Sequence, residues 1–223
     1  MQSIMNSRKK EVVIIDYQLG NLFSVKQACD TVGIIAKISS KREDILNADA
    51  LILPGVGAFI QAMNNLKKLD LLNPIIDIVK NEGKALFGIC LGQQLLFTES
   101  EEFGAGKGLD IISGVIKRLP EKFDGEKIKV PHIAWNKIYS YSHNWENTPL
   151  NELENKDFMY FIHSYYVKPS NISCILTNTN YNGIEFCSSV LEKNIFATQF
   201  HPEKSGDKGI SIYKNWALNN NLI

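Results

Sequence analysis

The sequence has 223 residues, of which 44% are hydrophobic and 22% are charged, a composition typical of a globular protein with one large domain. Its 24 lysine and arginine residues balance 24 aspartate and glutamate residues, which argues against binding to nucleic acid or to an acidic membrane surface. No apolar stretch approaches the roughly 20 residues of a membrane span. The four cysteines form no CxxC pair, which favours reduced thiols in a cytoplasmic protein.

The first ten residues are polar and basic. The apolar run that follows covers only residues 12–15, shorter than the roughly 7–15 residues in the core of a signal peptide. We therefore expect a flexible tail over residues 1–10 and a single domain over residues 11–223.

In the first half of the chain, short apolar runs alternate with segments of helical periodicity. Buried strands are predicted at residues 12–15, 34–38, 50–53 and 85–89, and helices at residues 22–33, 42–47, 59–80 (interrupted near Asn73-Pro74) and 93–98. Such alternation predicts an α/β fold with a mainly parallel sheet covered by helices on both faces.

From about Ser113 the pattern changes to shorter, mixed strands. These are predicted at residues 114–118, 158–167, 173–177, 188–192 and 195–200, with a hairpin turn at Lys193-Asn194 and a closing helix over residues 209–218. No repeat or linker divides the chain. The fold class is therefore a single α/β domain whose C-terminal sheet portion is mixed.

The segment Gly88-Ile89-Cys90-Leu91-Gly92 lies where a predicted strand runs into a helix. This is the layout of a nucleophile elbow, in which a sharp turn lifts the side chain above the sheet and flanking glycines prevent clashes. A cysteine alone is more often a small core residue. The two glycines at a strand–helix junction favour a nucleophile instead.

A second segment, Gln199-Phe200-His201-Pro202-Glu203, follows the last predicted strand. In an extended chain, side chains two residues apart face the same side, so Glu203 can accept a hydrogen bond from His201 and fix its tautomer. The spacing alone is often a surface pair, and metal binding is the other alternative. His132, His143 and His163 show no ligand spacing to His201, so neither a metal nor another cofactor is expected.

A third segment, Leu53-Pro54-Gly55-Val56-Gly57-Ala58, is a glycine-rich turn at a strand end. The backbone N–H groups of Gly55, Val56 and Gly57 are candidates for an oxyanion hole together with that of Leu91. A phosphate cradle is the alternative, but no Lys-Ser/Thr follows as in a P-loop. The run from Gly104 to Gly108 also lacks P-loop spacing and is expected to be a flexible turn.

Together these segments make the sequence resemble the class I (triad) glutamine amidotransferases, and within them the glutaminase subunits of imidazole glycerol phosphate synthase. The resemblance runs from Val12 to Trp216. It is carried by the segments at residues 15–22, 53–59, 88–94, 131–136, 160–165 and 199–205. The last of these is nearly diagnostic for the class, and residues 131–136 indicate the subfamily.

The resemblance implies an enzyme that hydrolyses L-glutamine and passes ammonia to a (β/α)8-barrel synthase partner, as a heterodimer, in histidine biosynthesis. It assigns Cys90 as nucleophile, His201 as general base and acid, and Glu203 as the residue that orients His201. It places the glutamine pocket at Gln94, Glu102, Ser164 and Tyr165, and the ammonia exit and partner interface at Trp135, Asn136, Tyr160 and Lys204. Each pocket residue has a plainer interpretation; Glu102, for example, ends the charged run 99–102, which is typical of an exposed segment.

Two departures from the family pattern, Gln18 and Ala134 in place of the usual glycines, bear on the partner and not on the triad. A related glutaminase that feeds a surface-sugar or nucleotide-sugar amidotransferase is the first alternative. A cysteine peptidase or DJ-1-like hydrolase that shares the elbow is the second. A non-enzymatic module would need a broken triad, and none of the three positions is broken.

Overall fold

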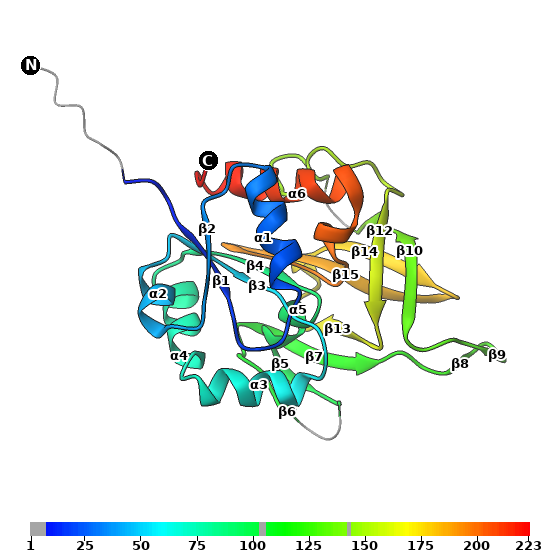
Figure 1. The fold of residues 1–223 in the computed structure, drawn as a ribbon. Helices are drawn as coiled ribbons and strands as arrows, with labels where there is room; N and C mark the ends of the chain where they lie inside the picture. Colours follow the sequence, from blue (N-terminus) through cyan, green and yellow to red (C-terminus); the bar gives the residue numbers. More distant parts are fainter. Residues whose placement is uncertain (1–7, 103–105, 142–143) are drawn as a thin grey trace, which may run out of the picture.

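The protein, described here by a computed structural model, is built on a long central sheet (Figure 1). The structure describes residues 8–102, 106–141 and 144–223. Within them, twelve strands form the central sheet, and two further strand pairs lie outside it. None of the helices in these ranges is long and apolar enough to cross a membrane.

One half of the sheet is parallel, in the order β2-β1-β3-β4-β16. Its strands are β1 (Val12–Ile15), β2 (Ala36–Ser39), β3 (Ala50–Leu53), β4 (Ala85–Ile89) and β16 (Ile195–Thr198). Every residue of β1, β3, β4 and β16 is buried, as expected where helices cover both faces of a parallel sheet.

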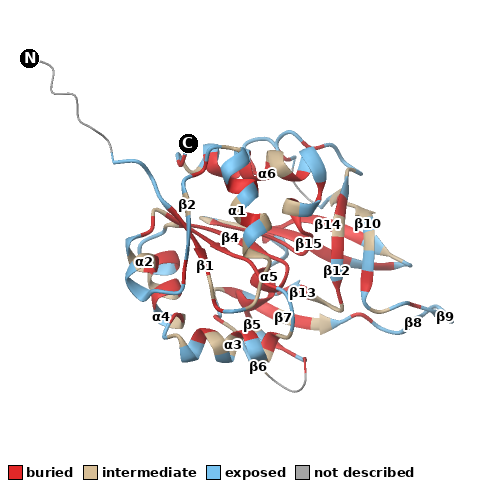
Figure 2. Cartoon of the chain, in the orientation of Figure 1, coloured by how far each residue is buried: buried red, intermediate tan, exposed pale blue. Residues whose placement is uncertain are grey.

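The two faces carry separate hydrophobic cores because successive strand residues point to opposite sides. Val13 and Ile15 belong to the core beneath α2 (Arg42–Asn47), α3 (Phe59–Lys68) and α4 (Leu72–Ile76). Val12 and Ile14 belong to the core beneath α1 (Leu22–Thr31) and α6 (Gly206–Asn219). Figure 2 shows the buried strands between these helices, whose outer surfaces are exposed.

The other half is mostly antiparallel, continuing through β15 (Ile184–Glu192), β13 (Tyr165–Pro169), β7 (Ile112–Arg118), β5 (Phe97–Ser100) and β6 (Gly106–Lys107). Strand β14 (Ile175–Tyr181) pairs with β15 and with β11 (Tyr139–Ser140). Outside the main sheet, β10 (His132–Lys137) pairs antiparallel with β12 (Phe158–His163), and β8 (Lys122–Phe123) pairs with β9 (Glu126–Lys127). The predicted α/β fold with a mixed C-terminal sheet is confirmed.

The predicted long helix over residues 59–80 is wrong in its point of interruption. The break comes at Asp70, whose φ of 55° ends α3 with a left-handed residue. Pro74 lies in the first turn of α4, where no helical N–H is required. A π-helical segment, Asp77–Asn81, then completes the region.

The predicted helix over residues 93–98 is correct only for residues 93–95. Helix α5 covers Leu91–Leu95, and Phe97 already begins β5, which pairs with β7. Three consecutive buried apolar residues, Leu95 to Phe97, fit a helix and a strand equally well, so periodicity could not separate the two. Two smaller shifts occur: the strand predicted at 34–38 begins at Ala36, and that predicted at 158–167 divides at Ser164 into β12 and β13.

The predicted tail falls mostly on residues 1–7, which lie outside the described ranges. Residues 8–10 are exposed, and Arg8 and Lys10 each form an ion pair with Asp49, with N–O distances of 3.0 and 3.5 Å. The predicted flexible turn at residues 104–108 also falls in part on residues that are not described.

Candidate active site

Cys90 occupies a sharp turn between β4 and α5. Its φ of 54° and ψ of −108° lie outside the regions that a residue with a side chain normally adopts, which costs on the order of 1–3 kcal/mol. Gly92 is required by a close contact, because a Cβ there would lie 1.7 Å from the Leu53 carbonyl oxygen. A Cβ on Gly88 would be tight, at 3.0 Å from the Ala197 side chain. The predicted elbow is therefore present in the backbone.

His201 and Glu203 form a buried pair beyond the end of β16. His201 Nδ1 lies 2.7 Å from Glu203 Oε1, and both side chains are 2% exposed. Burial lowers the pKa of His201, but the neighbouring Cys90 and the Glu203 carboxylate together outweigh it and raise this pKa to about 10. Within the described residues His201 Nε2 has no hydrogen-bond partner, so this nitrogen is the one free to exchange a proton.

Strand order brings the cysteine and the histidine segments together. Strands β4 and β16 are parallel neighbours with Ile89 opposite Thr198, and the Cys90 N–H donates to the Thr198 carbonyl at 2.7 Å. The two functional segments therefore leave the same edge of the sheet side by side. Strand β12 passes both: its Tyr160 carbonyl accepts from the His201 N–H at 2.9 Å, and its Ile162 carbonyl lies 3.8 Å from Cys90 Sγ.

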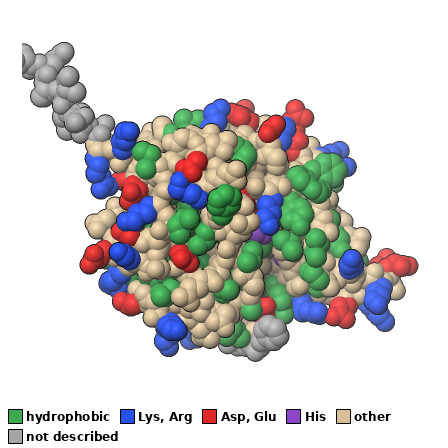
Figure 3. Space-filling view, in the orientation of Figure 1, with side chains coloured by type: hydrophobic (Ala, Val, Ile, Leu, Met, Phe, Trp, Pro, Cys, Tyr) green, Lys and Arg blue, Asp and Glu red, His purple; other side chains and the backbone are tan. Residues whose placement is uncertain are grey.

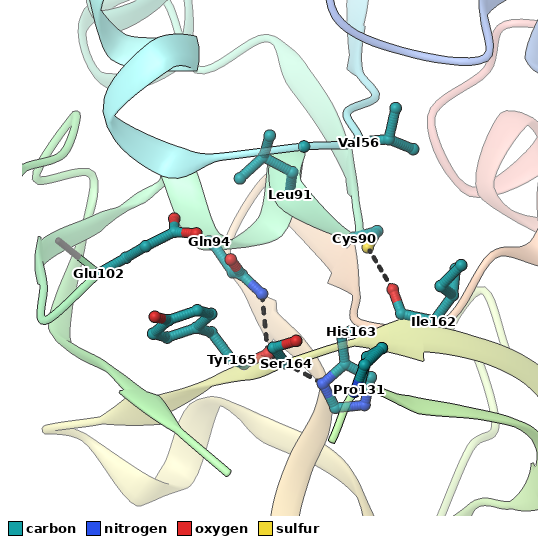
Figure 4. Close-up of a pocket in the computed structure, with 11 residues that line it drawn as sticks. Val56, Cys90, Leu91, Gln94, Glu102, Pro131, Ile162, His163, Ser164 and Tyr165 are labelled. Carbon is teal, nitrogen blue, oxygen red and sulfur yellow. Dashed lines mark hydrogen bonds between the residues drawn. The ribbon is translucent and has the colours of Figure 1, made fainter. Parts of the chain in front are cut away.

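A cavity of about 250 Å³ opens beside Cys90 (Figure 4). This is smaller than the roughly 300–1,000 Å³ of pockets for drug-sized ligands. All four residues predicted to bind glutamine line it. Its walls are formed by Val56, Gly57, Cys90, Leu91, Gln94, Glu102, Pro131, Ile162, His163, Ser164 and Tyr165.

Glu102 is not part of an exposed charged run, because only 8% of it is accessible. One carboxylate oxygen accepts from the Phe59 N–H at 2.6 Å, at the start of α3. Desolvation raises the pKa of Glu102, and this hydrogen bond partly offsets the shift. Glu102 therefore places a carboxyl group at the cavity wall and, at the same time, caps a helix.

The glycine-rich loop carries the predicted oxyanion residues. Val56, Gly57 and Leu91 line the cavity. The Leu91 N–H, however, donates to the Gly55 carbonyl at 3.4 Å. In this arrangement that N–H is occupied by the loop itself, and it becomes available to a substrate oxygen only if the Gly55 carbonyl turns away.

Tyr17 fixes the start of the same loop. Its buried hydroxyl donates to the Pro54 carbonyl at 2.7 Å, and a Cβ on Gly55 would lie only 2.0 Å from this hydroxyl oxygen. Gly57 has a φ of +101°, a conformation that glycine adopts easily. Rotation of the loop is therefore confined to the peptides after Gly55.

Three of the four residues predicted at a partner interface lie together. The Trp135 and Tyr160 rings are 6.1 Å apart, and Lys204 Nζ lies 6.0 Å from the Tyr160 ring centre. The expectation that all four share one face fails for Asn136. Because it neighbours Trp135 on β10, its side chain points to the other face, toward His132 and Asn180.

Sequence reasoning missed a buried pair of histidines, of which His163 lines the cavity. His132 Nδ1 lies 3.0 Å from His163 Nε2, and His163 Nδ1 lies 2.9 Å from the Tyr165 carbonyl oxygen. Burial lowers the pKa of His132 to about 4. Burial, with help from His132 and His201, lowers that of His163 to about 3. The signal available was their placement on one face of two strands that pair with His132 opposite His163.

Comparison with known proteins agrees with this geometry. The family model described as Glutamine amidotransferase class-I matches residues 13–220. The chain is 42% identical to the imidazole glycerol phosphate synthase subunit HisH of Geobacter metallireducens, covering 93% of this chain and 97% of that protein. It is 45% identical to the subunit HisH of Methanosarcina barkeri, covering 93% and 98%.

The fold is similar to solved structures of much lower identity. One described as a crystal structure of glutamine amidotransferase aligns with a TM-score of 0.71 at 18% identity, covering 94% of this chain and 98% of that one. The structure of PurLQS from Thermotoga maritima aligns with a TM-score of 0.68 at 18% identity, covering 95% and 99%. The chain thus belongs to the class I glutamine amidotransferases and, within them, to the family of the imidazole glycerol phosphate synthase subunits HisH.

Proposed function

We propose that this chain hydrolyses L-glutamine with Cys90, His201 and Glu203 and delivers the ammonia to a synthase partner that makes imidazole glycerol phosphate in histidine biosynthesis. The observation that carries the proposal is the strained Cys90 elbow beside the buried His201–Glu203 pair, at the mouth of a small cavity. The name shared by the curated relatives supports the pathway.

The chemistry follows from the positions of these groups. The Cys90 thiolate attacks the glutamine carboxamide carbon, and the carbonyl oxygen becomes an oxyanion. His201, protonated because its pKa is raised, gives its Nε2 proton to the leaving nitrogen, and ammonia departs from a glutamyl thioester. Water then attacks the thioester with His201 as base, which releases glutamate and restores the thiol. Glu203 holds the imidazole by its Nδ1 throughout.

The substrate fits the cavity by charge and by hydrogen bonding. Glu102 offers a carboxylate for the α-ammonium group of glutamine, while Ser164 and Tyr165 border the same cavity. Gln94 lies four residues after Cys90, on α5. Its side-chain amide forms part of the cavity wall. A cavity of this size fits one amino acid better than an extended peptide, which favours a glutaminase over a cysteine peptidase. The family match favours a glutaminase over a DJ-1-like hydrolase.

The conformation of the glycine-rich loop predicts slow glutamine hydrolysis by the isolated chain. With the Leu91 N–H donated to the Gly55 carbonyl, one oxyanion donor is missing, which is worth about 10²–10³ in rate. We propose that partner binding turns a peptide after Gly55 and releases this donor. Glutamine is then consumed only when a synthase is ready to receive ammonia.

The outer face of β10 and β12, meaning Ile133, Trp135, Phe158, Tyr160 and Ile162, is the proposed docking face for a (β/α)8-barrel synthase in a heterodimer. Four of these side chains, those of Ile133, Trp135, Phe158 and Ile162, are exposed large hydrophobic residues of the described chain. Figure 3 shows hydrophobic side chains gathered over this region. Monomeric proteins rarely expose such contiguous apolar patches.

The docking face also lies next to the chemistry, because the backbone of β12 contacts both His201 and Cys90 Sγ. Ammonia is protonated in bulk water at neutral pH, so an exit covered by a partner keeps it reactive. Four free, buried cysteines fit a reducing compartment, and we place the protein in the cytoplasm. A synthase that modifies a surface sugar or nucleotide sugar would use the same chemistry with a different partner.

The test is reconstitution with the synthase subunit encoded in the same genome. We expect a 1:1 complex, glutamate release that rises about 10²-fold or more with the synthase and its nucleotide ligand, and imidazole glycerol phosphate from glutamine. A purified chain that is fully active alone and unaffected by the synthase would contradict the proposal. Complex formation with a sugar-modifying synthase instead would support the alternative partner.

A further inference from the structure

Gln199 is completely buried and lies two residues before His201. Its Nε2 donates to Cys90 Sγ at 3.6 Å, yet it does not line the cavity. We infer that Gln199 is a positioning residue that holds the Cys90 sulfur with an amide N–H. Its orientation is set by the Tyr165 carbonyl through Gln94, and a hydrogen-bond relay from strand β10 ends on the same carbonyl. The inference rests on the proposed role of Cys90 as the nucleophile.

The orientation of the Gln199 amide follows from its neighbour. Gln94 Nε2 lies 2.9 Å from the Tyr165 carbonyl oxygen and 3.1 Å from Gln199 Oε1. Because a backbone carbonyl can only accept, Gln94 must present its NH₂ group there, and that group then also donates to Gln199. Gln199 must therefore turn its oxygen to Gln94 and its NH₂ to the sulfur. The flipped amide would place two donors against each other.

The relay continues from the same carbonyl toward β10. Tyr165 also accepts from His163 Nδ1 at 2.9 Å, so His163 Nε2 carries no proton and accepts from His132 Nδ1 at 3.0 Å. His132 Nε2 then accepts from Asn136 Nδ2 at 3.3 Å, and Asn136 Nδ2 also donates to the Asn180 carbonyl at 2.9 Å.

One arrangement of protons satisfies the whole relay, since both the Tyr165 and the Asn180 carbonyls can only accept. It requires both histidines to be neutral. Burial supports this, because it lowers the pKa of both rings far below neutrality. Asn136, misassigned by sequence to the docking face, is thus the outer end of a path of buried hydrogen bonds that reaches the nucleophile.

The relay matters because, besides the His201 imidazole, the sulfur has two hydrogen-bond partners, and these two favour opposite protonation states. The Ile162 carbonyl, 3.8 Å away, can accept from a thiol but repels a thiolate. The Gln199 amide can donate to a thiolate. A donor to a charged acceptor is worth about tenfold in the population of the charged form. Gln199 therefore favours the reactive form of Cys90.

Alkylation of the full-length chain by iodoacetamide tests this directly, with Cys90 modification followed by mass spectrometry from pH 6 to 9. In Gln199→Met, we expect the rate at pH 7 to fall about tenfold and the pH profile to move to higher pH. In Gln199→Glu, which keeps an acceptor for Gln94 but turns an oxygen toward the sulfur, we expect a larger fall. The matched control is Gln93→Met, because Gln93 is equally buried and bonds to the Ala197 carbonyl at 3.4 Å instead of to the sulfur.

His132→Phe tests the outer part of the relay. The ring shape is kept, since His132 stacks on Phe161 and Tyr181, but the donor to His163 is lost. We expect a two- to fivefold fall in the alkylation rate. Thermal unfolding of each variant, compared with Gln93→Met, separates loss of packing from loss of the donor.

Wild-type rates and an unshifted profile in both Gln199 variants would overturn the inference, as would an equal fall in Gln93→Met. A wild-type rate in His132→Phe would overturn the relay beyond Tyr165. If the chain with its synthase hydrolyses glutamine but shows no dependence on Gln199, this inference alone fails. If alkylation depends on Gln199 but glutamine is never hydrolysed, the proposed function alone fails.

Discussion

The two sides of the β10–β12 pair differ sharply, although they belong to the same twelve residues. The inner side buries His132, Met159, Phe161 and His163 against the active site. The outer side exposes Ile133, Trp135, Phe158 and Ile162, all at least 39% accessible. The inner side is explained by the contacts it makes within this chain. The outer side has no such explanation, because nothing in the described fold covers it.

This difference separates two kinds of requirement. Inner residues and the adjoining elbow hold reacting atoms in place, so changes there should alter glutamine hydrolysis itself. Outer residues other than Ile162, which also lines the cavity, contribute little to the core and do not touch the cavity. Changes at these residues should leave hydrolysis and folding nearly intact and alter only what reaches a partner. An inner substitution that spared hydrolysis, or an outer one that abolished it, would contradict this distinction.

Cys90→Ala should abolish glutamate release, by on the order of 10⁴-fold or more, because no other group can form the thioester. Its φ of 54° remains strained with alanine. Cys90→Gly should be equally inactive but about 1 kcal/mol more stable than Cys90→Ala, since glycine relieves the strain. Steady-state glutamate release and urea unfolding measure the two effects. Near-normal activity in Cys90→Ala would refute the nucleophile assignment.

His201→Ala should reduce kcat by about 10²–10⁴-fold, because acid–base catalysis is lost. Glu203→Gln should reduce it less, since an amide can still accept from the imidazole while the carboxylate charge that raises the pKa of His201 is lost. Rates for the two variants in the reconstituted complex give the order. A more severe effect at Glu203 would mean that the two roles are reversed.

The sequence predicted the elbow and the His201–Glu203 pair well, but it did not predict the β10–β12 pair. The elbow and the His201–Glu203 pair were predictable because each is local: adjacent glycines, a strand end and a spacing of two residues define them. Strand order then brings them together, and α/β alternation already indicated a parallel sheet. By contrast, β10 was missed. Its alternation of buried and exposed residues includes His132 and Asn136 on the buried side, and polar residues there conceal the strand pattern.

Gln199 and Asn136 show a second limit. Their roles depend on donors and acceptors from five separate strands or helices, and no spacing in the sequence connects Asn136 with a cysteine 46 positions earlier (136 − 90). The resemblance placed Asn136 with Trp135 at the partner interface. A strand, however, turns adjacent side chains to opposite faces, and only the observed pairing of β10 with β12 shows which face each one takes.

Tyr160→Ala and Lys204→Ala should lower the fraction of hydrolysed glutamine whose nitrogen appears in product, by several-fold to tenfold, because both side chains lie at the proposed exit. Lys204→Ala should change the free energy of unfolding by no more than about 0.5 kcal/mol, as for most surface substitutions. Tyr160→Ala should lower it by about 1 kcal/mol, because the ring is half-buried. Ile172→Ala is the control, since Ile172 is 61% exposed outside the docking face. Full coupling in both variants would remove the support for docking at this face.

The smallest expected effect is the pH dependence of stability from the inner side. The pKa of His163 falls from an ordinary 6.5 to about 3 because the ring is buried. Below pH 6.5 the unfolded chain therefore binds a proton that the folded chain does not. The contribution of His163 is full above pH 6.5 and is lost as the pH falls toward 3, at about 1.4 kcal/mol per pH unit.

Between pH 7 and pH 5.5, the contribution of His163 to the free energy of unfolding should fall by about 1 kcal/mol. His132 acts in the same direction. His201 does not interfere, because its pKa is raised: folded and unfolded chains both bind that proton below pH 6.5, and its contribution is lost only as the pH rises toward 10. Urea unfolding at pH 7 and 5.5 should show the loss, and His163→Gln, whose amide can still donate to Tyr165 and accept from His132, should reduce it. Equal free energies of unfolding at both pH values would mean that the inner histidines are not held neutral. The inner side of the β10–β12 pair would then not differ from the outer side in its electrostatics.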